Sequence, residues 1–363
     1  MKVLLVDSSY PINTRNTRIV NSLKKIYKQF QPHVCAWNRD KRVESNQEGI
    51  CYHVYDKPAA YGNPFKKIIA LFSYFFYVRS LNLRLQPSVL IASHWDMLVI
   101  CSLIKTKKQK LVYENLDLPT ASSTFARKLL DRLERFSLKK ADLIIFASRF
   151  FEGRYSFFHG QKIILENLPL KSVQNSIKKY TYTSDRLKIS FIGTVRYFEV
   201  MKNLIDSISG LDVEVLFWGD GPDLEKLKLY AEKNSCVKFF GKYEYDNIRD
   251  IYELSDLIWA VYPSQDYNVK YAISNKFYEC FMYCRPGIFA KDTCLAELVE
   301  QDQIGFTVDP YNEYEIRNLL HKINVNPDLI ETLKINLTRS VGRRHWEDNE
   351  ELLKIEFDKL CKE

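Results

Sequence analysis

Hydrophobic residues recur along this sequence in two alternating patterns. Short, nearly uninterrupted apolar runs, such as residues 3–6, 187–192 and 257–261, are typical of strands buried on both faces of a parallel sheet. Between such runs lie longer segments in which apolar residues return at every third or fourth position, as in amphipathic helices. One such segment, residues 125–141, has an apolar side formed by Leu129, Leu130, Leu133, Phe136 and Leu138. Because strand and helix patterns alternate along the chain, the sequence predicts an α/β protein with parallel sheets.

A polar segment, residues 171–186, separates two halves of this pattern and is expected to be a linker. A chain of 363 residues is too long for one ordinary hydrophobic core. We therefore expect an N-terminal domain over residues 1–170 and a C-terminal domain over residues 187–345. The Gly-x-Gly-x-x-Gly turn of dinucleotide-binding proteins is absent after the first strand, which argues against a nicotinamide or flavin enzyme.

The composition is that of a soluble globular protein, with 46% hydrophobic and 27% charged residues. None of the eight cysteines forms a Cys-x-x-Cys pair, so we expect small buried thiols of a reducing compartment and no metal site. The first apolar run ends after five residues at Asp7, which indicates a strand and not a signal peptide. No apolar run approaches the length of a membrane span. The expected location is therefore the cytoplasm.

Charge is distributed unevenly along the chain. Residues 1–170 contain 27 Lys and Arg against 13 Asp and Glu, a net charge of +14, and the remainder carries −6, which together give the overall +8. A basic first half fits an anionic partner, either nucleic acid or a membrane leaflet. Residues 65–85 are unusually aromatic and flanked by basic residues, which fits a helix buried against a sheet or an interfacial helix. Nucleic acid is disfavoured because these aromatics cluster in one apolar run instead of alternating with positive charges.

The most informative stretch covers residues 274–297. Ser274 or Asn275 can cap a helix, a short strand follows at residues 288–290, and a second helix begins near Asp292. Two helix N-termini and a lysine attract phosphate, and a carboxylate accepts ribose hydroxyls. Lys276, Glu279 and Glu297 therefore indicate a site for a nucleoside diphosphate.

This stretch resembles the donor-sugar signature of family 4 glycosyltransferases, also called glycosyl transferases group 1. The residues that match without a gap are Asn275, Lys276, Glu279, Pro286 and Glu297. The resemblance implies the GT-B fold, in which two Rossmann-like domains face each other across a crevice and a C-terminal helix, here residues 346–363, crosses back to the N-terminal domain. It also implies that Glu279 binds the ribose. The family's earlier glutamate falls on Tyr271, and its Gly-Gly pair falls on Thr293 and Cys294.

The resemblance also indicates where the diphosphate would bind in the C-terminal domain. Relatives usually have Gly-Arg after the first strand of this domain and a lysine five residues later, where this chain has Gly193, Thr194 and Glu199. Arg196 and Lys202 lie nearby and are the expected substitutes, because a phosphate needs cationic donors. Gly193 would let the ligand approach the backbone closely.

Catalytic candidates follow two strands of the N-terminal domain. Relatives commonly place a histidine and an acid after the strand at residues 111–113, and here Leu116 takes the place of the histidine and Asp117 that of the acid. If the reaction inverts the anomeric centre, a carboxylate must deprotonate the acceptor, with Asp117 as first choice and Glu114 and His94 behind it. A retaining reaction needs no such base in its usual form, and the sequence leaves both open. No metal and no cofactor other than the donor substrate is implied.

We therefore expect a hexosyltransferase of the metal-independent type that moves a sugar from a nucleotide sugar to a lipid-linked or saccharide acceptor in surface, capsular or exopolysaccharide synthesis. The basic N-terminal domain would bind an anionic membrane surface, so the enzyme would be peripheral at the inner face of the cell membrane. One alternative is a sugar-nucleotide epimerase or hydrolase of the same fold. Another is a non-catalytic nucleotide-sugar-binding assembly protein, suggested by Tyr271 in place of the glutamate.

Overall fold

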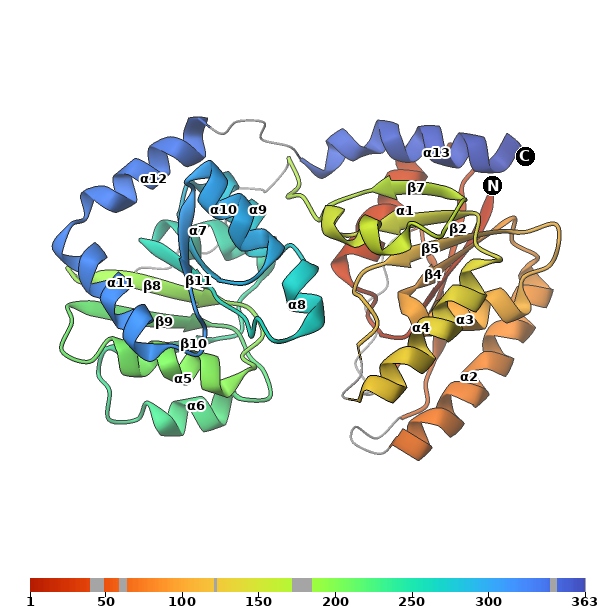
Figure 1. Ribbon diagram of the computed structural model, residues 1–363. Helices are drawn as coiled ribbons and strands as arrows, with labels where there is room; N and C mark the ends of the chain where they lie inside the picture. The colour runs from red at the N-terminus through yellow and green to blue at the C-terminus, as the bar shows by residue number, and fades with distance from the viewer. Residues whose placement is uncertain (40–48, 59–63, 121–122, 172–184, 340–344, 363) are drawn as a thin grey trace. The chain divides into compact units, whose positions relative to one another are not determined.

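The structure is a computed structural model that describes residues 1–39, 49–58, 64–120, 123–171, 185–339 and 345–362, without the side chains of residues 64–69 and 362. Most of the expected linker, residues 171–186, lies outside the described residues. The chain forms two compact units (Figure 1). Unit 1 consists of Met1–Asn167 together with Trp346–Glu363, and unit 2 consists of Leu168–His345.

Unit 1 is built on a parallel sheet that, in the described part of the chain, has seven strands. From one edge to the other they are β3 (Cys51–Tyr55), β2 (Gln31–Trp37), β1 (Lys2–Asp7), β4 (Val89–Ser93), β5 (Lys110–Asn115), β6 (Leu143–Phe146) and β7 (Gln161–Ile164). The central strands are buried on both faces, as their continuous apolar runs predict. The direction of winding reverses between β1 and β4, and ligands of such sheets bind outside the strand ends at that point.

Helices cover both faces of this sheet (Figure 1). α1 (Thr14–Ile26) and α13 (Glu350–Lys362) lie on one face, and α2 (Pro64–Leu85), α3 (His94–Ile104) and α4 (Thr124–Leu138) lie on the other. Short 3₁₀ helices cover Arg149–Tyr155 and Trp346–Asn349.

The C-terminal segment is part of unit 1, as expected for a helix that returns to the N-terminal domain. The indole of Trp346 is buried and donates a hydrogen bond to Ser22 Oγ at 2.9 Å. Further along, Lys25 forms an ion pair with Glu350 at 2.6 Å, and the hydroxyl of Tyr27 donates to Asp358 at 2.8 Å. These contacts fix α13 on α1, so unit 1 contains both ends of the chain.

Two helices of unit 1 leave apolar side chains in solvent. α2 buries Tyr74, Val78 and Leu81 against the sheet and exposes Phe72 and Phe76. The interfacial interpretation of residues 65–85 stays a prediction. α4 buries Leu138 together with Glu134, whose carboxylate accepts hydrogen bonds from two tyrosines. Most of its predicted apolar side faces solvent instead, with Phe125 80%, Leu129 48%, Leu133 39% and Phe136 59% exposed.

Unit 2 has a second parallel sheet, with six strands among the described residues. Their order is β10 (Val237–Gly241), β9 (Val213–Trp218), β8 (Leu187–Ile192), β11 (Leu257–Ala260), β12 (Gly287–Ala290) and β13 (Gly305–Val308). The winding reverses between β8 and β11. Its helices are α5 (Phe198–Ser207), α6 (Leu224–Tyr230), α7 (Ile248–Glu253), α8 (Tyr267–Tyr271), α9 (Asn275–Tyr283), α10 (Cys294–Asp302), α11 (Glu313–Val325) and α12 (Asp328–Arg339), with a 3₁₀ helix at Tyr245–Asn247. The predicted α/β class with parallel sheets is confirmed in both units.

Candidate functional site

The first site element of unit 2 is a buried ion pair at the start of α9. Ser274 caps this helix, because its hydroxyl accepts a hydrogen bond from the amide of Lys276 at 3.2 Å. One turn of helix then brings Lys276 and Glu279 together, with Nζ of the lysine 2.6 Å from Oε2 of the glutamate. Both side chains are buried, with 9% and 7% of their surface exposed. Two residues that the sequence assigned to one ligand are therefore direct partners.

Tyr252, at the end of α7, completes this arrangement. Its hydroxyl donates a hydrogen bond to the same Oε2 of Glu279 at 2.7 Å. Burial and the nearby Glu279 carboxylate raise the pKa of Tyr252 well above its usual value, so the phenol keeps its proton. Burial lowers the pKa of Lys276, but Glu279, Tyr243 and Tyr262 together outweigh burial, and the net shift of the pKa is upward. The lysine therefore stays a cation. Tyr252 and Lys276 both donate to Oε2 of Glu279, so Oε1 can accept a hydrogen bond from another donor.

α10 is the next helix along the chain and begins after β12. Thr293 caps it by accepting from the amide of Ala296 at 3.1 Å, and Glu297 is exposed in its first turn. The capped N-termini of α9 and α10 present backbone N–H groups and positive dipole ends, which are suited to an anion.

The loop after β8 lies at the point where the winding of this sheet reverses. Gly193 has φ 144°, and a Cβ placed there would meet nothing within 4 Å. The neighbouring Gly219, after β9, has φ 139°, and its Cβ would lie 1.8 Å from the carbonyl oxygen of Gly193. The glycine at 219 thus permits two loops to approach backbone to backbone, while Gly193 leaves open space.

The two expected cationic substitutes have different surroundings. Arg196 is exposed, and its guanidinium lies 4.8 Å from the centre of the Tyr197 ring. Lys202, one turn into α5, forms an ion pair with Asp206 at 2.8 Å. Gly193 and Arg196 follow β8, and Glu297 follows β12, so all three lie beyond the carboxyl ends of strands in one sheet. Their roles in binding stay predictions.

Sequence analysis missed the tyrosines around Lys276. Tyr243 and Tyr262 interact electrostatically with this lysine, and Tyr252 bonds its partner. Tyr252 lies 27 residues before Glu279 and carries no spacing signal, so only the packing of α7 against α9 brings it to the carboxylate.

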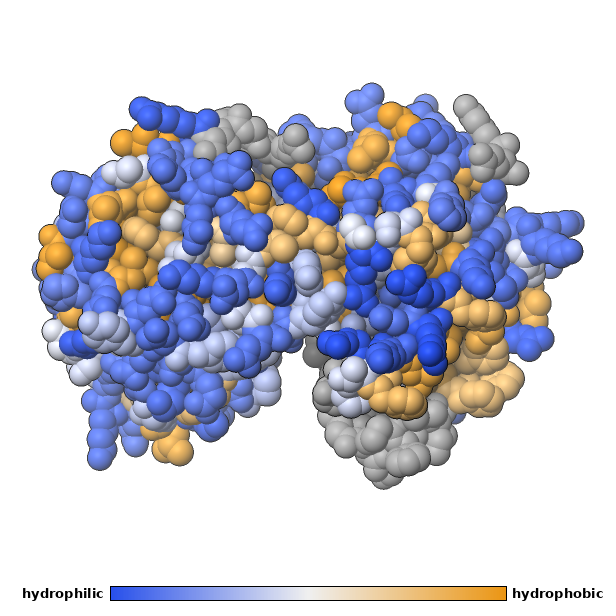
Figure 2. All heavy atoms as spheres, in the orientation of Figure 1, coloured by the Kyte–Doolittle hydropathy of each residue, from blue (hydrophilic) through white to orange (hydrophobic). Residues whose placement is uncertain are grey.

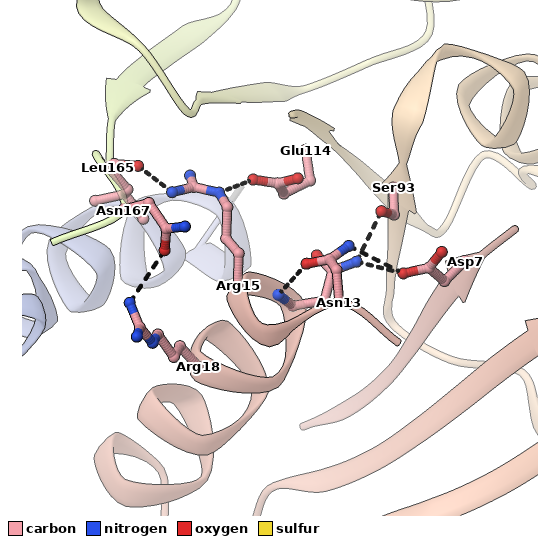
Figure 3. Close-up of polar contacts among 9 residues, drawn as sticks. Asp7, Asn13, Arg15, Arg18, Ser93, Glu114, Leu165 and Asn167 are labelled. Carbon is pink, nitrogen blue, oxygen red and sulfur yellow. Dashed lines mark hydrogen bonds and ion pairs between the residues drawn. The ribbon is translucent and has the colours of Figure 1, made fainter. Parts of the chain in front are cut away.

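Unit 1 has a polar network where the winding of its sheet reverses (Figure 3). The side-chain amide of Asn16 donates to Asp7 Oδ2, at the end of β1, and to Ser93 Oγ, at the end of β4, both at 2.7 Å. Asn13 caps α1 and also donates to Asp7 at 3.3 Å. The first turn of α1 is therefore fixed between two strand ends.

A second part of this network holds Glu114, one of the predicted bases. Arg15 of α1 pairs with the Glu114 carboxylate and also donates to the carbonyl of Leu165 (Figure 3). Arg18 donates to the side chain of Asn167 at 3.1 Å. Glu114 is completely buried, and burial raises the pKa of its carboxyl although the Arg15 charge opposes that shift.

The other two predicted catalytic residues follow neighbouring strands. His94 begins α3 directly after β4, is partly exposed, and has a left-handed backbone with φ 71°. A non-glycine residue in this region is uncommon and often marks a functional position. His94 interacts electrostatically with Glu114, while Asp117 is exposed two residues beyond β5. Asp117 is therefore more accessible to an acceptor than Glu114.

The two parallel sheets, their topology and the returning helix define a GT-B fold, and solved structures match it over the whole chain. Sucrose-phosphate synthase from Thermosynechococcus elongatus is 13% identical with a TM-score of 0.75, and the match covers 100% of this chain and 98% of that chain. HepE from Anabaena in complex with UDP is 15% identical with a TM-score of 0.70, covering 100% of both chains. A UDP-N-acetylglucosamine 2-epimerase is 12% identical with a TM-score of 0.61, covering 93% of this chain and 90% of that chain. No protein-family model and no curated protein matches the sequence.

Proposed function

We propose that this protein is a glycosyltransferase that moves a sugar from a nucleoside-diphosphate donor to a lipid-linked or saccharide acceptor. The observation that carries the proposal is the buried Lys276–Glu279 pair at the capped start of α9, within a GT-B fold. A buried ion pair is a costly arrangement for stability alone. Its place at a helix N-terminus supports a binding role.

The donor would bind to unit 2. Oε1 of Glu279 would accept a ribose hydroxyl, and Lys276 with the N-termini of α9 and α10 would attract the diphosphate. Arg196, Lys202 and the open backbone at Gly193 would complete the phosphate site, and Glu297 would border it. A uridine nucleotide is the first to try, because HepE was solved with UDP.

The acceptor would bind to unit 1, with Asp117 as general base if the reaction inverts configuration. His94 remains the second candidate, because its partial exposure and strained backbone suit a functional position better than the buried Glu114. Arg196, Lys202 and Lys276 would offset the charge of the departing diphosphate, and we propose that the enzyme uses no metal ion for this step.

A membrane-bound acceptor is supported by the surface of unit 1. Phe125, Leu129, Leu133 and Phe136 form an exposed apolar stripe on α4, and Lys128, Arg132 and Arg135 lie beside it on the same helix. Hydrophobic surface over α2 and α4 is visible in Figure 2. An apolar stripe bordered by cations is typical of helices that lie in the interface of an anionic membrane. Among the described residues, no helix combines the length and hydrophobicity needed to cross a bilayer. We propose that the enzyme is peripheral at the inner face of the cell membrane and acts in surface, capsular or exopolysaccharide synthesis.

The proposal is tested first by binding and then by transfer. Nucleotide sugars are screened for thermal stabilisation of the protein, because a ligand that binds only the folded state raises its stability. The stabilising donor is then incubated with lipid-linked saccharide acceptors in vesicles, and the saccharide product is measured. Absence of stabilisation by every nucleotide sugar would refute the donor site. Stabilisation without product under any acceptor would favour a non-catalytic binding protein.

A sugar-nucleotide epimerase or hydrolase is the second candidate, supported by the shared fold with UDP-N-acetylglucosamine 2-epimerase. The two functions differ in what they require. An epimerase or hydrolase converts the donor without any acceptor, whereas a transferase needs one. Measuring donor conversion in the absence and presence of acceptor separates them.

A further inference from the structure

The edge of the unit 1 sheet carries three metal-ligating side chains on one face. β2 and β3 pair in parallel, with His33 opposite Cys51. His53 lies two residues after Cys51 on β3, and because side chains of a strand alternate between faces, it points to the same side. The sequence alone did not predict a metal site here, because His33 lies on a different strand from Cys51 and His53 and the three residues form no short motif.

Two of the three pairs of ligand atoms already lie at separations that suit a single metal ion. Nδ1 of His33 is 3.1 Å from Nε2 of His53, and that nitrogen is 3.6 Å from Sγ of Cys51. All three atoms lie within 4.8 Å of one another. A tetrahedral zinc ion, with Zn–N of about 2.0 Å and Zn–S of about 2.3 Å, places its nitrogens roughly 3.3 Å apart and nitrogen and sulfur roughly 3.6 Å apart. Small side-chain adjustments would therefore suffice.

The site lies beside positive charges. Burial and the charge of Lys2 lower the pKa of His33, and burial, His33 and Arg84 lower the pKa of His53. Lys2 and Arg84 also repel a cation, and a Cys51 thiolate would offset part of that repulsion.

The site is also accessible. Cys51 is exposed and both histidines are partly exposed. His33 and Cys51 line a depression of about 490 Å³ at the surface. Because two of the three ligands border this depression, a fourth coordination position would be open to water or another ligand.

We propose that His33, Cys51 and His53 bind one Zn²⁺ ion through Nδ1, Sγ and Nε2, respectively, and so fasten edge strand β3 to β2. Binding converts the Cys51 thiol to a thiolate, and its proton passes to the solvent. Two nitrogen ligands and one sulfur ligand suit zinc, which prefers this mixture in four-coordinate sites. An edge strand gains from such a link because, among the described residues, β3 has a hydrogen-bonded neighbour on one side only.

The test uses the full chain after treatment with a chelator. Zn²⁺ is titrated by calorimetry, and Co²⁺ is added separately to observe the charge-transfer absorption of a cobalt–thiolate bond. We expect one equivalent of Zn²⁺ to bind, the cobalt band to appear, and the melting temperature to rise with Zn²⁺. Cys51→Ser and His53→Gln are each expected to weaken binding by more than about tenfold, because even residues that only support a ligand change affinity by that factor.

Matched controls are Cys361→Ser and His159→Gln, which alter an exposed cysteine and an exposed histidine of unit 1 elsewhere. They are expected to leave affinity and the cobalt band unchanged. Circular dichroism of each metal-free variant verifies that it is folded, and His33→Gln replaces any variant that is not. If wild-type protein binds no stoichiometric zinc, or if Cys51→Ser binds as tightly and keeps the cobalt band, the two histidines share only a hydrogen bond and the proposal is wrong.

Discussion

Two lysine–glutamate pairs of unit 2 have the same three-residue spacing and the same N–O distance of 2.6 Å, in opposite environments. Lys276 and Glu279 are buried, whereas Glu331 on α12 is 64% exposed beside Lys334. Removing one partner of a buried pair leaves an uncompensated charge in the interior. Removing one partner of an exposed pair leaves a charge in water.

We therefore predict that Glu279→Ala lowers the free energy of unfolding of unit 2 by about 3–5 kcal/mol, because Lys276 stays buried and unpaired. The variant should also lose most of its affinity for nucleotide sugars. Glu331→Ala should change the free energy by less than about 1 kcal/mol and leave donor affinity unchanged. Urea denaturation and calorimetric titration measure the two effects.

The variant Tyr252→Phe tests whether loss of donor affinity in Glu279→Ala comes from the missing carboxylate or from a disturbed α7–α9 contact. It removes one hydrogen bond to Glu279 but retains the ring and the ion pair. Donor affinity should fall much less than in Glu279→Ala. Equal affinity of wild type and Glu279→Ala for every nucleotide sugar, measured well below the melting temperature, would contradict the role of Glu279.

The histidine pair of unit 1 predicts a pH dependence of stability in the metal-free protein. The pKa values of His33 and His53 are lowered in the folded state from the usual 6.5, so the unfolded chain binds protons more readily just below that pH. The free energy of unfolding should therefore rise as pH increases toward 6.5 and fall as pH decreases below it. His53→Gln should flatten this dependence in urea melts recorded between about pH 5 and 7. If His53→Gln keeps the wild-type slope, folding does not lower the pKa of His53.

At the scale of elements, the loops after β8 and β9 depend on one glycine. A Cβ at residue 219 would overlap the carbonyl oxygen of Gly193, and φ 139° is unfavourable for other residues. We predict that Gly219→Ala destabilises unit 2 by about 1–3 kcal/mol and weakens donor binding by displacing the Gly193 loop. Gly153→Ala is the control, because a Cβ there meets nothing within 4 Å. Thermal melts with and without donor distinguish the two variants, and a Gly219→Ala protein with wild-type stability would refute the predicted clash.

α4 offers a direct test of membrane association. Replacing Phe125 and Phe136 by serine removes two exposed apolar side chains without touching the buried Glu134 or Leu138. We predict weaker sedimentation with anionic vesicles and an unchanged melting temperature, because burial of an aromatic side chain contributes about 1.5–3 kcal/mol. Leu229→Ser, which alters an exposed leucine of unit 2, should leave vesicle binding unchanged. Wild-type protein that ignores anionic vesicles at low salt would contradict the membrane proposal.

At the scale of the whole molecule, unit 1 depends on a segment that follows unit 2 in sequence. Trp346 is buried, and the guanidinium carbons of Arg15 and Arg18 lie 5.7 and 5.9 Å from its ring centre. We predict that Trp346→Ala destabilises unit 1 by about 3–5 kcal/mol and leaves unit 2 unaffected. Hydrogen exchange read by mass spectrometry assigns the loss to peptides of one unit. Tyr314→Ala, at an exposed aromatic residue of α11, is the control, and uniform destabilisation of both units would contradict the assignment.

The strands were predictable where they are buried on both faces, because such strands consist of consecutive apolar residues. The strand at residues 187–192 was predicted with the bounds found for β8, and the others agree within a few residues. Burial direction was less predictable for helices. The apolar residues of α4 recur at helical spacing, but this spacing does not determine which side of the helix packs inward. In the structure, Glu134 is on the buried side because its carboxylate accepts hydrogen bonds from two buried tyrosines.

The sequence by itself determined the α/β alternation and the helix that carries Lys276 and Glu279, because both follow from spacings of a few residues along one chain segment. Only the tertiary structure decided that Tyr252 bonds Glu279, that Arg15 pairs with Glu114, and that His33 meets His53. These contacts join residues 20 to 99 positions apart. Their formation depends on strand order and helix packing, which short-range periodicity does not encode.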